Sequence, residues 1–168
     1  MANTIYYKKD PEVLGMSNGL TSVFINVLGL SGSRLAVKNY EKNLIIFLLE
    51  KDQASVGIGT VGFDICEMPW DIDAFKEQKQ FLFHVIDDVL LKNGWNKLSY
   101  NPNYDMVANS MEGFRKLLQK MQVEDIDKEA VQEWMECFEE ERKDIDKYLV
   151  CEIHNVLLTC FGCQVCHD

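Results

Sequence analysis

Residues 19–30 read GLTSVFINVLGL, and this stretch decides how the chain folds. Its large side chains recur three and four positions apart, which is the spacing of one face of an α-helix. Ser17 or Asn18 can cap the start of this helix, because each side chain accepts a hydrogen bond from a free backbone amide. Gly29 and Gly32 weaken a helix, so we expect them near its end or at a tight crossing. The apolar face consists of Leu20, Val23, Phe24, Val27 and Leu28.

Apolar residues at helical spacing mark four further regions, at residues 37–48, 73–89, 105–121 and 127–157. The first contains a continuously apolar run, so a buried strand is the alternative there, although the charged residues around the run favour a helix. The last region is predicted to form two helices or one bent helix, because its apolar stripe resumes after three consecutive glutamates.

Two segments depart from the helical period. Thr4–Lys9 is rich in β-branched and aromatic residues, which predicts a short edge strand. Residues 54–71 contain three glycines and a proline, which predict a shaped loop or a short extended element. We therefore predict a mostly α-helical, compact single domain over residues 1–168, a bundle of about five to seven helices with a short strand pair near the N-terminus.

Composition places the chain among ordinary globular proteins of the cytoplasm. Apolar residues make up 47% of the 168 residues, and no apolar run approaches the roughly 20 residues that a membrane-spanning helix needs. The first ten residues lack the charged-then-apolar order of a signal peptide. We expect a cytoplasmic protein that does not bind membranes, whose six cysteines are mostly buried, reduced thiols.

The net charge of −10 comes almost entirely from one segment. Residues 124–152 hold twelve acids and four bases, whereas residues 1–123 are nearly neutral. Negative charge disfavours nucleic acid and anionic membranes as partners and favours a basic protein.

The acids of this segment recur at helical spacing, so that like charges meet on one face at a cost of a few tenths of a kcal/mol per pair. One hypothesis is a contact surface for a basic protein partner, and the alternative is a solvated helix face that aids solubility. The predicted contact residues are Glu129, Glu133, Glu136, Glu140 and Asp144.

Gly57, Gly59 and Gly62 satisfy the pattern G-x-G-x-x-G. A dinucleotide site needs a strand before this pattern and a helix N-terminus directly after it, so that backbone amides point at the pyrophosphate. That context is missing here, and a tight loop that requires positive φ angles is the simpler interpretation.

The same loop carries Asp64, Glu67, Trp70 and Asp71. Loops that combine an aromatic residue with acids are common contact surfaces, so we predict that these four residues bind a partner. Trp70 as a packing anchor is the alternative, and carboxylates that support acid–base chemistry are a further one.

The C-terminal cysteines suggest a metal site. Two-residue gaps let one turn aim two ligands at the same ion, and the pairs here have that spacing. The predicted zinc ligands are Cys160, Cys163, Cys166 and His167. A set of Cys151 and His154 with Cys160 and Cys163 is a second hypothesis. Buried reduced thiols on a helix face are the third, because the two pairs are not separated by a finger-length segment.

Three stretches of the first half of the chain resemble small bacterial proteins that are encoded beside polymorphic toxins as immunity proteins. They are GLTSVFINVL at 19–28, GIGTVGFDI at 57–65 and MPWD at 68–71. The resemblance implies a protein that neutralises a toxin by binding its active surface, often through acidic residues. The resemblance assigns no function to individual residues of this chain.

We therefore expect a protein-binding module rather than an enzyme, and the resemblance implies an immunity protein that neutralises a basic toxin domain through the acidic helical segment. A metal-binding protein built on the terminal cysteines, or a small enzyme that uses the loop carboxylates, is the alternative.

Overall fold

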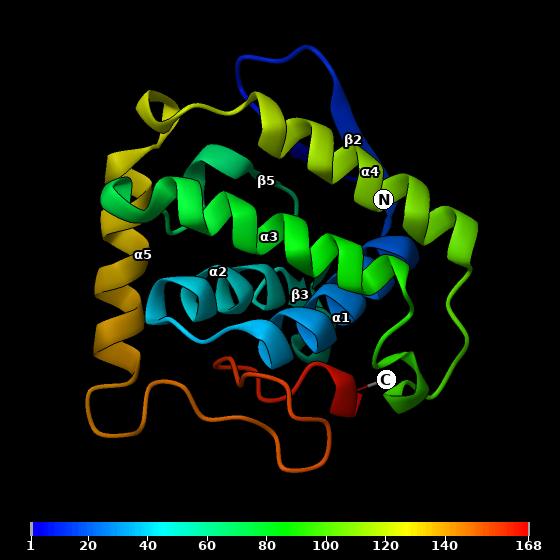
Figure 1. The fold of residues 1–168 in the computed structure, drawn as a ribbon. Helices are drawn as coiled ribbons and strands as arrows, with labels where there is room; N and C mark the ends of the chain where they lie inside the picture. The colour runs from blue at the N-terminus through cyan, green and yellow to red at the C-terminus, as the bar shows by residue number, and fades with distance from the viewer. Residues whose placement is uncertain (1, 168) are drawn as a thin grey trace.

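The computed structural model describes residues 2–167, with side chains from residue 3 to residue 166. Five α-helices dominate it, together with a small N-terminal sheet, so the prediction of a mostly helical fold with N-terminal strands is confirmed (Figure 1). The helices are α1 (Asn18–Leu35), α2 (Asn39–Leu49), α3 (Phe75–Leu90), α4 (Tyr104–Lys120) and α5 (Lys128–Glu141).

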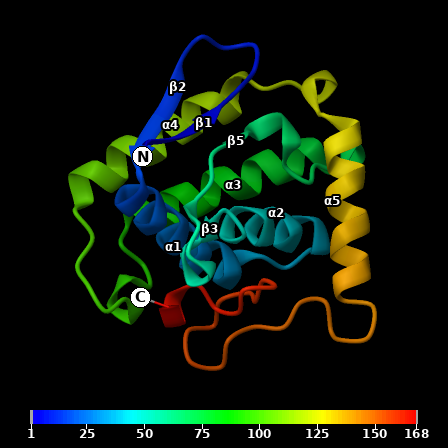
Figure 2. The same cartoon turned by 180° about the vertical axis from the view of Figure 1, so that it is seen from behind.

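Two small sheets lie beside the helices, and Figure 2 shows the strands of the larger one from behind. Its order is β2-β1-β5, with β1 antiparallel to β2 and parallel to β5. The predicted edge strand is therefore a central one, and it ends at Tyr6 rather than at Lys9. The strands are β1 (Ala2–Tyr6), β2 (Val13–Ser17), β3 (Asp52–Gln53), β4 (Gly59–Thr60) and β5 (Phe63–Asp64).

Residues 2–167 also form six short 3-10 helices, five of which lie between longer elements while the sixth is the last element. Each is three residues long. They are η1 (Ala54–Val56), η2 (Ile65–Glu67), η3 (Ile72–Ala74), η4 (Trp95–Lys97), η5 (Val123–Asp125) and η6 (Val165–His167).

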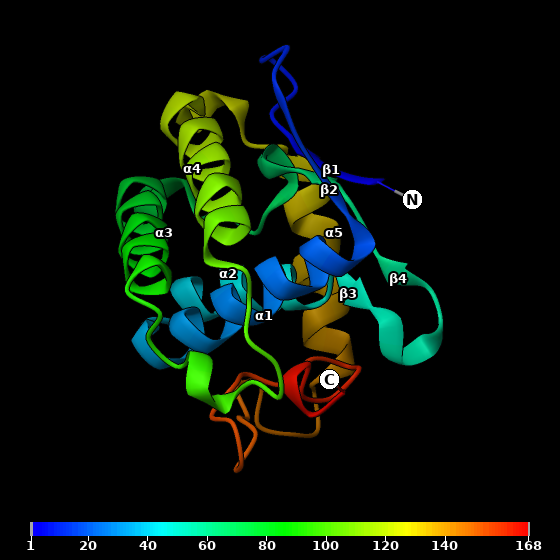
Figure 3. The same cartoon turned by 90° about the vertical axis from the view of Figure 1, so that its right-hand side faces the viewer.

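Helix α1 contacts most of the other elements. Figure 3 shows α3 and α4 on one side of it and the strands on the other. Ser17 caps its start, since the hydroxyl accepts a hydrogen bond from the amide of Leu20 at 3.2 Å. The two glycines sit at a tight crossing with α2, as predicted. A Cβ on Gly29 would lie 2.5 Å from Leu49 Cδ2, and one on Gly32 would collide with Ile45.

Helix α2 contains the continuously apolar run, so the strand alternative is excluded there. The run suits a helix that is buried on most sides. Every residue from 43 to 49 is buried, between α1, α3 and the aromatic side chains of α5.

The apolar stripe at 145–157 does not form the predicted helix. Helix α5 ends at Glu141, and no α-helix follows it in the part of the chain that the structure describes. Ile145 and Ile153, which would belong to the buried face of that helix, are 57% and 77% exposed. Two isolated antiparallel bridges, Val150–Leu157 and Thr159–Gly162, order the segment instead. The helical spacing of the apolar residues at 145–157 predicted a helix that does not form, and only some of these residues are buried.

The loop over residues 54–64 confirms the simpler interpretation of its glycines. Gly57 and Gly59 have φ angles of 81° and 85°. Gly62 has no room for a side chain, because a Cβ there would lie 2.9 Å from the backbone nitrogen of Thr4 and closer still to its carbonyl oxygen. The glycines lead into β5 and a 3-10 helix, so the helix N-terminus that a dinucleotide site requires does not follow them.

We predict that Gly62→Ala lowers the free energy of unfolding by about 1 to 3 kcal/mol, because backbone atoms of β1 cannot move aside as a flexible side chain would. Urea denaturation measures the change. Gly15→Ala is the matched control, since nothing lies within 4 Å of its Cβ position. Equal stability of the two variants would contradict the close approach of β5 to β1.

A buried carboxylate joins the N-terminal strands to the start of α5. Asp125 is 2% exposed and accepts hydrogen bonds from the hydroxyl of Tyr7, the amide of Gln122 at 3.0 Å and the ammonium of Lys9. Burial raises its pKa, but the bonds from Lys9 and Tyr7 outweigh burial and lower the pKa from 3.8 to about 2.

Asp125→Asn should lower the free energy of unfolding at pH 7 by about 2 to 3 kcal/mol, because it removes a charge-assisted bond from a buried group. A carboxylate whose pKa is lower in the folded state stabilises the fold above the unfolded pKa. Its contribution is lost as the pH falls from about 4 to about 2.

Urea titrations across that pH range test this prediction. The variant should lose less stability than the parent between pH 4 and pH 2. Asp144→Asn is the control, because Asp144 is exposed and makes no ion pair with residues 2–167. A parent curve that is parallel to that of Asp125→Asn would contradict the prediction.

Candidate metal centre

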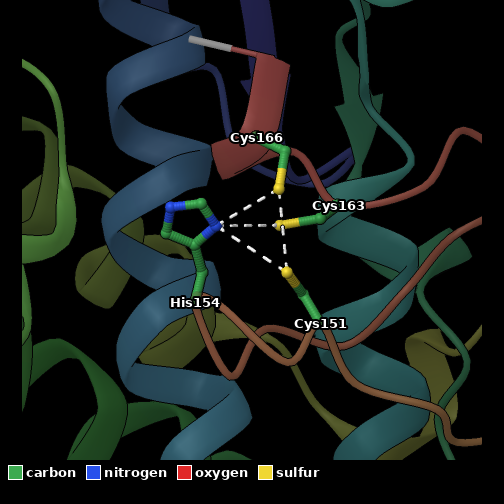
Figure 4. Close-up of side chains that lie close together, drawn as sticks. All are labelled: Cys151, His154, Cys163 and Cys166. Carbon is green, nitrogen blue, oxygen red and sulfur yellow. Dashed lines mark hydrogen bonds between the residues drawn. The ribbon is translucent and has the colours of Figure 1, made fainter.

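Four metal-ligating side chains converge in the C-terminal segment: Cys151, His154, Cys163 and Cys166 (Figure 4). Their donor atoms all lie within 4.8 Å of one another. The Nδ1 atom of His154 lies 3.7 Å from the sulfurs of Cys151 and Cys163 and 3.3 Å from that of Cys166. The sulfurs of Cys151 and Cys166 are 3.7 Å apart.

The first two donors come from one tight turn. Cys151 and His154 are three residues apart, and the turn closes where Asn155 adopts a positive φ of 56°. The amide of Cys151 donates a hydrogen bond to the carbonyl of Val156 at 2.8 Å. The amide of Asn155 donates one to the carbonyl of Cys151, also at 2.8 Å. The backbone amides of Ile153 and His154 stabilise the thiolate of Cys151 and so lower the pKa of its thiol.

The second pair of donors repeats this arrangement. Cys163 follows Gly162, whose φ of 87° turns the chain, and Cys166 lies in η6. Backbone amides of Val165 and Cys166 bond the sulfur of Cys163. In each turn, therefore, the first cysteine receives two amides and the residue three positions later supplies the second donor.

The core holds both turns in place. Val156, Leu157 and Val165 are buried side chains of the hydrophobic core. The amide of Leu157 donates a hydrogen bond to the hydroxyl of Ser33 on α1 at 3.0 Å. The ammonium group of Lys97 in η4 donates one to the carbonyl of His154 at 3.2 Å. The cluster is thus fixed at the edge of the core, with Cys163 buried and Cys166 exposed.

The thiols differ in acidity. Burial raises the pKa of Cys151, but the amides of His154 and Ile153 and the imidazole outweigh burial and lower the pKa to about 6. Burial raises the pKa of Cys163 to about 12 despite its amides. A bound cation would favour the thiolate form of both, since a coordinating thiol is deprotonated by its metal.

The donor spacing fits a tetrahedral ion. With metal–sulfur bonds of about 2.3 Å and a metal–nitrogen bond of about 2.0 Å, the edges of a tetrahedron are roughly 3.5 to 3.8 Å. The four distances above, 3.3 to 3.7 Å, lie close to four of the six edges, and all six donor separations are within 4.8 Å. Three thiols and an imidazole form a donor set that closed tetrahedral sites use. The group can therefore hold a metal ion.

This set combines halves of the two hypotheses from the sequence. Cys163 and Cys166 belong to it, and so do Cys151 and His154. Cys160 does not, because it lies with Glu50 and Glu141 instead. The side chain of His167 lies outside the described residues. The sequence signal for these residues is the repeated two-residue gap, C-x-x-H followed by C-x-x-C, but Cys160 and Cys163 have the same gap, so the pattern does not select between Cys160 and Cys166.

The acids predicted to contact a partner lie along α5 and just beyond it, and all five are exposed. Only Glu140 forms an ion pair with another described residue, Lys143 at 2.9 Å. The Nε2 atom of Gln132 donates to Glu136 at 3.0 Å. We call Glu129, Glu133, Glu136, Glu140 and Asp144 the acidic face.

Two of the four loop residues predicted to bind a partner are buried in the fold. Trp70 is 3% exposed, packs against Phe75 at 5.0 Å and donates its indole N–H to the carbonyl of Ile65 at 2.8 Å. Asp64 is also buried and caps η2. These two residues are therefore not surface contacts: Trp70 is the packing anchor of the alternative interpretation, and Asp64 has a capping role. Glu67 is half-buried, and Asp71 is exposed and caps η3.

Within residues 2–167, no helix has both the length and the apolar character needed to cross a membrane.

Comparisons with protein-family models, curated proteins and solved structures found no match for this chain.

Proposed function

We propose that the chain is a zinc-binding protein in which Cys151, His154, Cys163 and Cys166 hold one structural zinc ion. The observation that carries this proposal is the convergence of four donor atoms within 4.8 Å from two turns of matching design. Thiolates select zinc, copper(I) or iron, and a single imidazole among three thiolates in tetrahedral array favours zinc.

A structural role follows from the completeness of the donor set. Catalytic zinc sites have three protein ligands and leave the fourth position to water or substrate, whereas four protein ligands close the site. The ion would also act where the fold needs a constraint. Residues 142–164 contain no α-helix and only two isolated bridges, so few backbone hydrogen bonds order them. Zinc would tie this segment into one unit, because binding energy at such a site is folding energy.

Protein purified without added zinc should contain about one equivalent of zinc by mass spectrometry, and Cys163→Ser should reduce this to below about a tenth. Removing the ion with a chelator should lower the free energy of unfolding by about 4 kcal/mol when free zinc is about a thousand times its Kd. Cobalt(II) in place of zinc should give the intense visible bands and thiolate charge-transfer absorption of a tetrahedral site.

Matched variants decide which residues are ligands. His154→Ala should lose the metal and His167→Ala should keep it. Likewise, Cys151→Ser should lose the metal, while Cys160→Ser and Cys137→Ser should keep it. Loss of the metal in Cys160→Ser but not in Cys151→Ser would contradict this ligand set. Less than a tenth of an equivalent in the parent protein, with a Cys151–Cys166 disulfide in its place, would reject the zinc proposal.

We also infer that the acidic face binds a basic protein. The specific observation is that four of its five acids make no ion pair with a described residue, although bases are present in the same segment. Unneutralised charge of one sign speeds association with a partner of the opposite sign. The resemblance to immunity-type proteins favours a toxin domain as this partner, and the product of the neighbouring gene is the first candidate.

Charge reversal of Glu133, Glu136 and Glu140 to lysine should slow association with that gene product by about tenfold at low salt. Stopped-flow or surface-plasmon kinetics at two salt concentrations measure the rate. The control reverses Glu77, Asp105 and Glu112, which are exposed on α3 and α4 and change the net charge equally. An association rate that salt does not affect, or equal slowing by both triple variants, would contradict a localised binding face.

A further inference from the structure

The three thiols of the metal centre differ in how far solvent reaches them. Cys163 is buried, with 6% of its surface exposed, Cys151 is half-buried and Cys166 is exposed. Figure 4 shows the three sulfurs converging, with that of Cys166 projecting from the last element of the chain, η6. A small oxidant that arrives from solvent therefore meets the sulfur of Cys166 first.

The exposed thiol has a second sulfur within reach. The Sγ atom of Cys151 lies 3.7 Å from the Sγ atom of Cys166. The sulfurs of a disulfide are about 2.05 Å apart, so the two side chains need to approach by less than about 2 Å. Because neither residue is buried, small movements of the two side chains can close this gap.

A bound ion would keep both sulfurs in their reactive form. A thiol that coordinates a metal is deprotonated, and the thiolate is the form that attacks an oxidant. Redox-sensing cysteines are accessible thiolates that lie next to a second, resolving cysteine. In the zinc-loaded protein, Cys166 would be the accessible thiolate and Cys151 the resolving one.

We propose that the metal centre is redox-sensitive and releases its zinc when a hydroperoxide oxidises Cys166 and Cys151 to a disulfide. The inference rests on the proposed zinc centre. It adds the class of oxidant, the two thiols that react and the fate of the ion.

The reaction removes two electrons from the two sulfurs. The thiolate of Cys166 attacks the terminal oxygen of the hydroperoxide, so that an S–O bond forms, the O–O bond breaks and the leaving alkoxide takes up a proton. The thiolate of Cys151 then attacks the sulfur of the resulting sulfenic acid, and the hydroxide that leaves becomes water with a second proton. One hydroperoxide is thus reduced to an alcohol and water for each disulfide formed.

The disulfide removes two of the four donors. Only His154 and Cys163 remain, whereas structural zinc sites use four protein ligands, so the affinity for the ion falls and the ion leaves. A thiol reductant regenerates the two thiols, and added zinc then restores the starting state.

The same disulfide keeps the C-terminal segment in place. A bond between residues 151 and 166 joins the two turns that the ion joined, and the loop that it closes contains the buried side chains of Val156, Leu157 and Val165. Oxidation therefore exchanges one link between the turns for another. The expected result of oxidation is release of the metal without unfolding.

The test starts from protein that is purified with a phosphine reductant, loaded with one equivalent of zinc and then freed of excess reagents. Hydrogen peroxide is added, a chromogenic chelator reports the released zinc, and mass spectrometry of alkylated peptides maps the disulfide. We expect one zinc ion released for each Cys151–Cys166 disulfide, and zinc binding that returns after treatment with dithiothreitol and zinc.

Two variants assign the reacting thiol. Cys166→His keeps a sulfur or nitrogen donor at all four positions, a set that closed zinc sites also use, and should slow the release at least about tenfold. The double variant Cys137→Ser, Cys160→Ser is the control, because it removes two exposed thiols outside the donor set and should release zinc at the parent rate.

Separate outcomes identify which part fails. A Cys163–Cys166 disulfide, release without a disulfide, or release from Cys166→His at the parent rate would overturn the assigned pair. If Cys166→His holds no zinc, the disulfide map of the parent decides. Zinc that stays bound while the Cys151–Cys166 disulfide forms would overturn the release.

The metal content of the reduced parent is measured before peroxide is added. A reduced parent that binds no zinc fails the proposed function, and the release step fails with it. The disulfide map of that protein still decides whether Cys151 and Cys166 are the oxidised pair.

Discussion

The close crossing of α1 and α2 is the contact on which the rest of the structure depends. Gly29 and Gly32 allow α2 to approach α1 very closely. The side chains of Leu49 and Ile45 on α2 occupy the space that a Cβ atom at position 29 or 32 would need. Helix α1 can then contact α3, α4 and the strands on its other sides. Two glycines are costly inside a helix, at roughly 1 kcal/mol each relative to alanine, and the packing of α2 offsets that cost.

The C-terminal segment is held by a different kind of constraint. After Glu141 the described part of the chain contains no α-helix or strand, only one 3-10 helix and two isolated bridges, and it relies on a few buried side chains such as Val156 and Leu157. Its four metal donors lie where a single ion would link two turns, of which the first is bonded to Ser33 and Lys97 and the second is anchored by the buried side chain of Val165. In the proposed function, the ion would order this segment, as backbone hydrogen bonds order the helices.

Much of the helical architecture was predictable because a helix is a local structure. The caps Ser17, Asn103 and Asp127 each accept a hydrogen bond from an amide three residues later, and the apolar spacing that follows each cap needs no distant partner. The prediction failed at 145–157, where apolar residues at helical spacing remain exposed. Spacing indicates which residues would share a face if a helix formed, but not whether anything covers that face.

The sequence by itself determined the mostly helical fold, the concentration of charge after residue 123 and the presence of paired metal donors with two-residue gaps, and it allowed a tight crossing as one of two roles for Gly29 and Gly32. Only the tertiary structure decided which donors meet. Cys160 is as close in sequence to Cys163 as Cys166 is, yet it points to Glu50 and Glu141. The donors are brought together by turns in which Asn155 and Gly162 have positive φ angles, and by core packing of Val156 and Leu157. The amide of Leu157 also bonds Ser33 of the distant helix α1.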